Sequence, residues 1–445
     1  MLKSLLNAFK VKDLRKRLIF VFLMLVVIRF GSNLPIPGVN SAYFQQLFDS
    51  MSNNDAFGWF NTMTGGSFEQ LSIFALSITP YITSSIIIQL LTVAFPSLEE
   101  LSKDEDGRKK LTEYTRYVTI GLALIESVAM AVGFGSQGLL VGYTTASAAR
   151  KFADIVIAVV GMTAGSALLM WIGEQITDKG IGNGISIVLL FNILSSIPSD
   201  FQTLYIRFIK GKNISTMVVM TIIIIAAIVA MTAFTVLLND AERKIPVQYS
   251  RRMQGRVLTG GQSSNIPLKV NTANVMPVIF ASSLMTMPVV IGQILKVDYG
   301  TIGGKILMML NSGSWCNPDA PIYSIGLVIY ILLLYFFAYF YTSISFNPLE
   351  IANNMKKSGG FIPGIRPGKP TSDYLDNILT YIIFIGATGL TIVAIIPIII
   401  SGVFNVSRIS FSGTSLIIIV GVVLETLQAI QSQMVVRNYK GFLED

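Results

Sequence analysis

Histidine is absent from the 445 residues, and cysteine occurs once, as Cys316. Without histidine the chain lacks imidazole general bases, Ser–His–Asp and Cys–His nucleophile systems, and the usual zinc and haem ligands. One cysteine cannot form a disulfide within the chain, so nothing in the fold depends on an oxidising compartment. We therefore expect a protein that is not an enzyme and that uses no metal and no cofactor.

Charge is also scarce. Only 13% of the residues are charged and 52% are apolar, whereas about 25% of an ordinary soluble chain is charged. Several apolar stretches without charge are long enough for a bilayer core of about 30 Å. The pattern predicts an all-α integral membrane protein with ten transmembrane helices, near residues 18–34, 71–96, 117–134, 152–172, 183–198, 217–238, 271–295, 322–346, 376–404 and 411–436.

Lys and Arg set the orientation of these helices. If both chain ends are cytoplasmic, 24 of the 33 basic residues lie in cytoplasmic segments and 8 in exterior segments, with Arg29 inside the first span. The positive-inside rule favours this topology strongly. The first apolar run has no small-residue cleavage site after it, so we expect it to remain as an uncleaved span.

Ten spans divide into two sets of five that enter the membrane in opposite directions. Because each set has an odd number of spans, the two sets can form an inverted repeat, which is frequent in transport proteins. We expect an N-terminal half at 1–198, an exterior connection at 199–216 and a C-terminal half at 217–445.

The segment before the second span is rich in glycine and polar residues, reading FGWFNTMTGGSFEQLSIFAL from Phe57. Such backbone is tolerated at membrane depth only against protein or water. It predicts a short mobile half-helix that fills a cavity, with Gly65 and Gly66 as flexible points. The alternative is an exterior loop followed by a plain helix.

Small and weakly polar residues interrupt the second and seventh spans. They are Thr79, Pro80, Thr83, Ser84, Ser85 and Gln89 in the second, and Asn271, Asn274, Pro277, Ser282 and Ser283 in the seventh. Residues of this kind let helices approach closely and separate cheaply. They indicate a helix pair that parts, or ordinary contacts between two membrane helices.

Two cytoplasmic loops are long and basic. The first, 239–269, includes Arg251, Arg252 and Arg256, and the second, 347–375, includes Lys356, Lys357 and Arg366. Pro and Gly residues around Arg366 predict a turn with this side chain at its tip. Such loops suit an acidic protein surface or RNA phosphates. The alternative is a topology signal that also attracts anionic lipid.

The order of several long motifs resembles the SecY family, the channel-forming subunits of protein translocases. The matching runs are RFGSNLPIPG (29–38), SIFALSITPYITSSIIIQLLTV (72–93), GRKKLTEYTRY (107–117), MWIGEQITDKGIGNGISI (170–187), NIPLKVNTANVMPVIFASS (265–283), NPLEIANNMKKSGGFIPGIRPG (347–368) and GTSLIIIV (413–420). The resemblance extends from the first predicted span to the tenth.

The resemblance implies two inverted five-helix halves around a central hourglass pore, in the bacterial plasma membrane. It implies roles for four sets of residues. The pore ring is Ile78, Ile82, Leu189, Ile279 and Ile418; the plug, about 57–71, includes Phe57, Phe60, Met63, Gly65, Gly66 and Phe68; the lateral gate includes Thr83, Ser85, Gln89, Asn274, Ser282 and Ser283; and the docking residues are Arg251, Arg252, Arg256, Lys356, Lys357 and Arg366.

The family also implies a function and partners. A member of it moves unfolded preproteins across the membrane and releases transmembrane segments sideways into lipid. The implied partners are the SecE and SecG subunits, the SecA ATPase motor, the ribosome, preproteins with their signal sequences, anionic lipids and a second channel of the same kind. An outside motor is required, since the chain has no GxxxxGK[ST] phosphate-binding loop.

A secondary transporter for a small solute is the alternative function. It shares the inverted parity and the broken helix, and it needs a substrate site at the midplane of the membrane. Glu126 is the only acidic residue near the middle of a predicted span. Saturable uptake of a solute by this chain alone favours the transporter.

Overall fold

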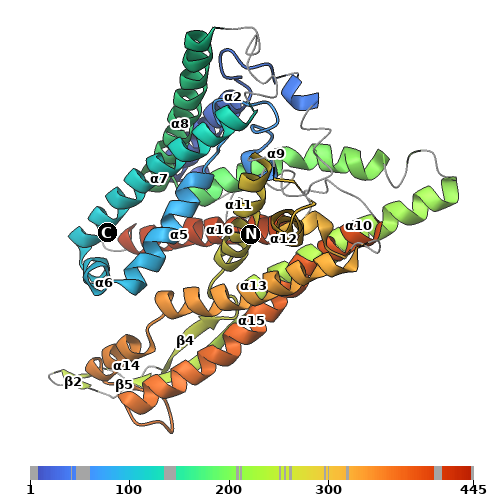
Figure 1. The fold of residues 1–445 in the computed structure, drawn as a ribbon. Coiled ribbons are helices and arrows are strands. Elements are labelled where there is room, and N and C mark those ends of the chain that lie inside the picture. The colour runs from blue at the N-terminus through green and yellow to red at the C-terminus, as the bar shows by residue number, and fades with distance from the viewer. Residues whose placement is uncertain are drawn as a thin grey trace.

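The structure, a computed structural model, describes residues 9–41, 43–46, 61–134, 147–206, 210, 213–249, 252–254, 257–259, 263–294, 297–298, 300–316, 320–404 and 413–441. Most of these residues are helical (Figure 1). The α-helices are α2 (Lys12–Ser32), α5 (Thr79–Ala94), α6 (Pro96–Lys103), α7 (Glu105–Phe134), α8 (Ala148–Lys179), α9 (Gly184–Leu204), α10 (Ile214–Asp240), α11 (Met276–Ile294), α12 (Ile302–Leu310), α13 (Ile325–Ser345), α14 (Pro348–Lys357), α15 (Lys369–Phe404) and α16 (Gly413–Gly441). Two short 3-10 helices, η3 (Ser312–Ser314) and η4 (Pro321–Ser324), precede α13.

Within the described ranges, seven helices are long and apolar enough to cross a membrane: α7, α8, α9, α10, α13, α15 and α16. The bent pair α5 and α6, which meet at 107°, adds an eighth. Helix α10 shows why a bilayer is needed, because its most apolar window has a mean hydropathy of 2.7 and none of it is buried in the protein. Side chains such as Ile222 and Leu237 are 61% and 69% exposed, which suits lipid and not water.

Two of the ten predicted spans, in α2 and α11, are not long and apolar enough to count among these membrane-crossing helices. Helix α2 has 21 residues but opens with several basic side chains and has Arg29 in its last turn. The apolar part of α11, Met276–Gly292, is shorter than the others. The helical class of the prediction is therefore confirmed, while its count of ten exceeds what length and composition establish.

The second and seventh predicted spans begin later than expected. Helix α5 starts at Thr79 and not near 71, because Leu71 and Ser77 adopt positive φ angles of 44° and 52°. Helix α11 starts at Met276 and not at 271, because Asn274 has a φ of 53°. A residue in the left-handed region cannot continue a right-handed helix. Both helices thus begin just after a strained turn.

The helices pack in two groups that touch at several places. In the first group α7 contacts α5 and α8, and α8 contacts α2 and α9. In the second group α15 contacts α10, α13 and α16, and α11 contacts α13. Figure 1 shows α7 and α8 of the first group toward the upper left and α13 and α15 of the second toward the lower right, with α9 and α16 running between them. The groups meet where α7 contacts α11 and where α9 contacts α16.

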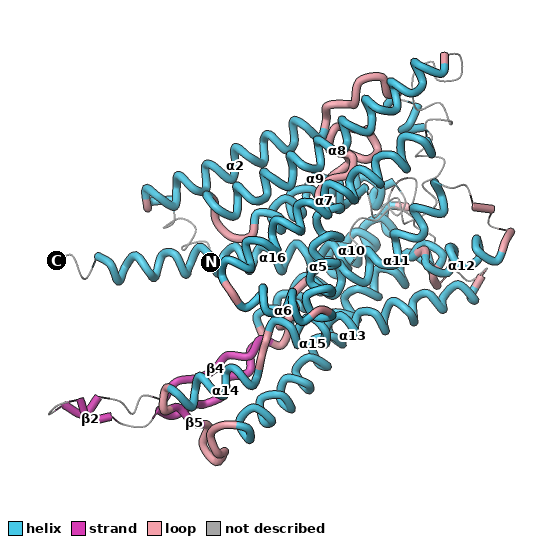
Figure 2. The backbone as a smooth tube through the Cα atoms, turned by 60° about the vertical axis from the view of Figure 1, so that its left-hand side comes forward, coloured by secondary structure: helices cyan, strands magenta, loops and turns pink. Residues whose placement is uncertain are grey.

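Strands were not predicted, yet the two basic loops form one sheet. Strand β1 (Glu242–Tyr249) pairs antiparallel with β4 (Ser263–Lys269) and with the two-residue β5 (Gly360–Phe361), in the order β4-β1-β5. Strands β2 (Arg252–Gln254) and β3 (Val257–Thr259) pair separately. Figure 2 shows β4, β5 and α14 projecting from the helices as one unit. Pairing of β1 with β5 joins the first basic loop to the second.

The three-stranded sheet has its own apolar core. Ile245 and Val247 alternate inward along β1, and Leu268 of β4 joins them. They pack with Met355 of α14 and with Leu375 of α15. The period of two that marks a half-buried strand was present at Ile245 and Val247, but the surrounding charges concealed it.

Candidate functional site

Five aliphatic side chains from four helices belong to one apolar cluster. Ile78, at the N-cap of α5, is buried, as are Leu189 of α9, Ile279 of α11 and Ile418 of α16. Ile82 of α5 is partly buried and packs against the same cluster. All five residues predicted for the ring therefore belong to one apolar cluster, although they lie as far apart in the chain as 78 and 418.

We call this larger apolar cluster, which also contains Met63, Trp315 and Tyr330, the central cluster. None of the five predicted ring residues within it has a hydrogen-bonding side chain. A close-packed aliphatic constriction excludes water and ions by being dry and not by binding them. It can also yield when a chain enters, because dispersion contacts are individually weak and have no required direction. The arrangement suits a seal.

The Gly-rich segment lies against the central cluster. Met63 is buried in that cluster, whereas Phe68 is buried in a neighbouring cluster, edge-to-face with Phe44 at a centroid distance of 5.7 Å. Gly65 and Gly66 have φ angles of 66° and 82°, which glycine adopts without steric cost. The described part of the segment, residues 61–71, is thus packed inside the protein. Phe57 and Phe60 lie outside the described residues.

Two polar residues of α9 that the sequence analysis missed contact this segment. Asn192 donates to the backbone carbonyl of Met63 at 3.1 Å, and Ser195 lies 3.2 Å from the carbonyl of Gly65. Arg29 of α2 also donates to the carbonyl of Gly65, at 3.0 Å. The available signal was an amide in an otherwise apolar span, which by itself points to a function.

The polar residues predicted for the lateral gate make most of their hydrogen bonds within their own helix group. Thr83 donates to the carbonyl of Thr79 at 3.1 Å, and Gln89 donates to Ser85 at 3.3 Å. In α11, Ser282 is buried with its hydroxyl 3.4 Å from that of Tyr330 on α13, and Ser283 is also buried. Asn274 accepts at its backbone carbonyl from Asn271, at 3.1 Å. On the side of α5 and α11, contact between the groups passes through α7 and α11.

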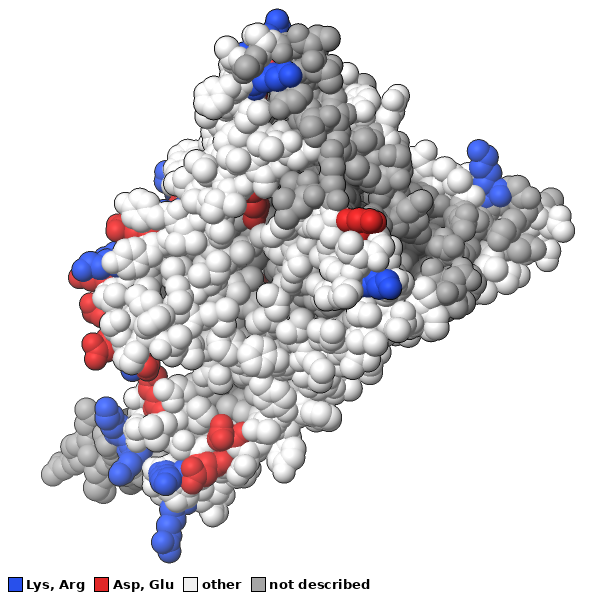
Figure 3. Space-filling view, in the orientation of Figure 1, with Lys and Arg blue, Asp and Glu red and all other residues white. Residues whose placement is uncertain are grey.

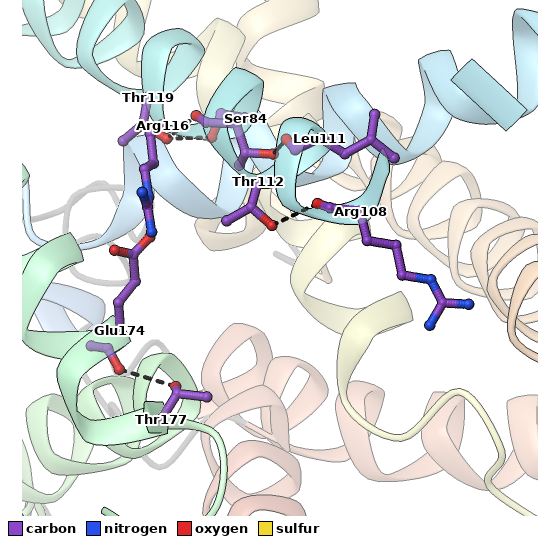
Figure 4. Close-up of polar contacts among 10 residues, drawn as sticks. Ser84, Arg108, Leu111, Thr112, Arg116, Thr119, Glu174 and Thr177 are labelled. Carbon is purple, nitrogen blue, oxygen red and sulfur yellow. Dashed lines mark hydrogen bonds and ion pairs between the residues drawn. The ribbon is translucent and has the colours of Figure 1, made fainter. Parts of the chain in front are cut away.

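Side-chain contacts bind α5, α7 and α8 into one unit (Figure 4). The hydroxyl groups of Ser84 on α5 and Thr119 on α7 lie 2.5 Å apart, and both residues are buried. Arg116 of α7 forms an ion pair with Glu174 of α8, with Nε and Oε1 2.8 Å apart. These contacts make it easier for α5 and α7 to move together than to separate from each other.

Basic side chains lie on the projecting sheet and on its neighbouring turn. Lys356 and Lys357 are exposed in the last turn of α14. Arg366 is exposed in a turn where Gly364 and Gly368 have φ angles of 84° and 107°. Figure 3 shows Lys and Arg gathered at this end, beside a few acidic groups. Of the other predicted docking residues, Arg252 lies in β2, and Arg251 and Arg256 lie outside the described residues.

Comparison with protein families decides the class. The family model described as SecY matches residues 72–427, which include α5, the five predicted ring residues, both basic loops and part of α16. The chain belongs to the SecY family. Among relatives in this family, the protein translocase subunit SecY of Streptomyces galbus is 44% identical and that of Halalkalibacterium halodurans is 41% identical. Each comparison covers 100% of both chains.

Solved structures share the SecY fold. One described as a protein conducting channel has a TM-score of 0.61 at 17% identity, covering 94% of this chain and 92% of the other. Another, in which the SecY plug domain is described as stabilising the closed state of the translocation channel, has a TM-score of 0.62 at 18% identity with the same coverage. The channel of a canine ribosome–channel complex has a TM-score of 0.59 at 16% identity, with 94% and 92% covered.

Proposed function

We propose that this chain is the protein-conducting channel of a general secretory translocase in the bacterial plasma membrane. It moves unfolded preproteins outward and releases transmembrane segments laterally into lipid, and it performs no catalysis. The observation that carries the proposal is the central cluster, which includes Ile78, Ile82, Leu189, Ile279 and Ile418 from four helices. Membership of the SecY family supports the same function.

Within the central cluster the five predicted ring residues form the pore ring, and the Gly-rich segment serves as the plug. Met63 packs in the same cluster as the ring residues, so displacement of the segment uncovers the ring. Gly65, Gly66 and Phe68 belong to the same plug, which extends over about 57–71. This role is supported by the structural relative in which a plug domain is described as maintaining a membrane seal.

We propose ten transmembrane helices in two inverted halves, 1–198 and 217–445, with both termini cytoplasmic. The ten comprise the seven longer helices together with α2, the bent pair α5–α6 and α11. Figure 2 shows that one side of the molecule carries the first turn of α2, the end of α16 and the basic sheet. Helix α12 lies toward the opposite side. Inversion is supported by α5 and α11, since each begins just after a residue with positive φ.

A lateral gate opens between the two helix groups. Helices α5 and α7 form one side of it and α11 with α13 the other, and the closed contact is that of α7 with α11. Thr83, Ser85 and Gln89 line the first side, whereas Asn274, Ser282 and Ser283 line the second. The Ser84–Thr119 bond makes the first side move as a unit when the gate parts.

The joined basic loops form one docking surface for the translocation machinery. Arg251, Arg252, Arg256, Lys356, Lys357 and Arg366 contact the SecA motor or the ribosome, to which positive side chains offer complementary charge. The ribosome is supported by structural relatives described in ribosome complexes. SecE and SecG complete the channel, anionic lipids bind its basic side, and two channels associate.

Reconstitution tests this function against small-solute transport. The chain is placed in vesicles with SecE, SecG and the SecA motor, and a preprotein is added outside with ATP. We expect ATP-dependent protection of the preprotein from protease, and no protection when ATP or the chain is omitted. Saturable uptake of a small solute by the chain alone, with no protected preprotein, contradicts the proposal.

A further inference from the structure

Two backbone carbonyls of the plug accept hydrogen bonds from distant helices. Residues 61–64 form a helical turn, which ends where the Gly65 amide donates to Thr62 and the Gly66 amide donates to Asn61. The carbonyls of Met63 and Gly65 accept from side chains of α9 and α2. These contacts are independent of the apolar packing of Met63.

Asn192 is placed to hold two parts of the segment at once. Its Nδ2 donates to the Met63 carbonyl at 3.1 Å and to the Ser77 hydroxyl at 3.0 Å. One amide nitrogen carries two hydrogens, so both bonds form together. Asn192 is 4% exposed, and at this burial an amide that loses its acceptors cannot replace them with water. Asn192 therefore favours the plug in its present position.

Arg29 and Ser195 converge on the next carbonyl, that of Gly65. Arg29 donates through Nη1 at 3.0 Å, and a charged donor makes a stronger bond than a neutral one. The Ser195 hydroxyl lies 3.2 Å from Gly65 and 2.7 Å from the carbonyl of Asn192, so its single hydrogen serves one of them at a time. Arg29 is thus the principal donor to Gly65.

The fit at Gly65 is close as well as polar. A Cβ atom there lies 2.8 Å from the Ser195 hydroxyl and 3.0 Å from the Asn192 Cα, which is tighter than side chains tolerate. The backbone can approach α9 only because residue 65 has no side chain. Because Gly65 has no side chain, its backbone can adopt a φ of 66°, and its carbonyl can reach the donors on α9 and α2.

We propose that Asn192 and Arg29 are positioning residues that latch the plug in the closed channel by holding the carbonyls of Met63 and Gly65. This inference rests on the proposed function, because it requires that residues 57–71 act as a plug. The latch biases the resting channel toward closure, and both bonds break when the plug leaves. Since the acceptors are backbone carbonyls, the latch needs no side chain of the plug, but it does require glycine at position 65.

The test measures resting ion conductance of the full channel complex in vesicles. Asn192→Leu keeps the branch at Cγ and removes the donor, and Arg29→Met removes the other donor independently. We expect Asn192→Leu to raise resting conductance by roughly fivefold, the factor that one typical hydrogen bond contributes to an equilibrium. We expect Arg29→Met to raise it by roughly tenfold or more, because its donor is charged. Thr235→Val, which removes a buried hydroxyl that bonds within α10, is the matched control and leaves conductance unchanged.

Deletion of residues 57–69 separates a failure of the latch from a failure of the plug. If the deletion raises conductance, and Asn192→Leu and Arg29→Met add nothing in the deleted chain, both residues act through the plug. An equal effect of Asn192→Leu with and without the plug overturns the latch. Conductance unchanged by the deletion itself overturns the plug. If the deleted chain conducts more than the parent but both single variants conduct normally, the latch is overturned and the plug assignment stands.

Discussion

Arg366→Glu lowers motor-driven export by roughly tenfold or more, because like charges placed across an interface cost several kcal/mol. Arg366 is exposed in the turn between β5 and α15, so its side chain is available to a partner. The turn is held by other groups, since Ile365 donates its amide to the Ile362 carbonyl at 3.0 Å and Thr371 donates to the Arg366 carbonyl at 2.8 Å. We therefore expect the variant to fold normally.

Lys305→Glu is the matched control for Arg366→Glu. It makes the same change of charge at an exposed site on α12, toward the opposite side of the molecule. Export is measured as ATP-dependent preprotein protection, and motor affinity as SecA binding to vesicles. We expect only Arg366→Glu to lower both. Unchanged export and unchanged SecA affinity in Arg366→Glu contradict the docking role.

Ile279→Ser together with Ile418→Ser raises the resting ion leak by about an order of magnitude. Both side chains are buried in the central cluster, on α11 and α16. An apolar constriction blocks ions because water leaves it, and hydroxyl groups let water stay. The measurement is the conductance of the closed channel complex in vesicles, with preprotein export measured in parallel to establish that the variant is folded.

Two controls isolate the ring from general damage. Ile279→Val with Ile418→Val keeps the constriction apolar, so we expect little added leak. Ile222→Ser introduces a hydroxyl on α10, at a side chain that is 61% exposed and faces lipid. A serine pair that exports preprotein and leaks no more than these controls shows that another part of the chain forms the seal.

Much of the helical fold was predictable, because bilayer length and charge distribution leave few choices. The apolar stretch at 217–238 became α10, and that at 376–404 became most of α15. The starts of α5 and α11 were not predictable, since they depend on positive φ at Ser77 and Asn274, for which neither residue type is diagnostic. The sheet was missed because β1 pairs with β5 across more than a hundred residues of sequence.

The candidate site was predictable in its apolar part and not in its polar part. Ile78 and Ile418 were assigned to the ring by resemblance to a family, and they meet in one cluster. Aliphatic residues are so common in spans that composition alone does not distinguish them. Asn192 was missed because its partner is a backbone carbonyl 129 positions away, and a carbonyl leaves no signature in the sequence.

Disulfide crosslinking of a stalled preprotein to the ring tests the central claim most directly. Cys316 is the single cysteine, so Cys316→Ser with Ile279→Cys yields one reactive position, in the central cluster. The preprotein carries one cysteine and is halted midway by a folded domain, in vesicles containing the motor. We predict a crosslink that appears only with the stalled chain and ATP. No crosslink at Ile279→Cys, with export intact and control cysteines reactive, contradicts the assignment of the central cluster as the conduit.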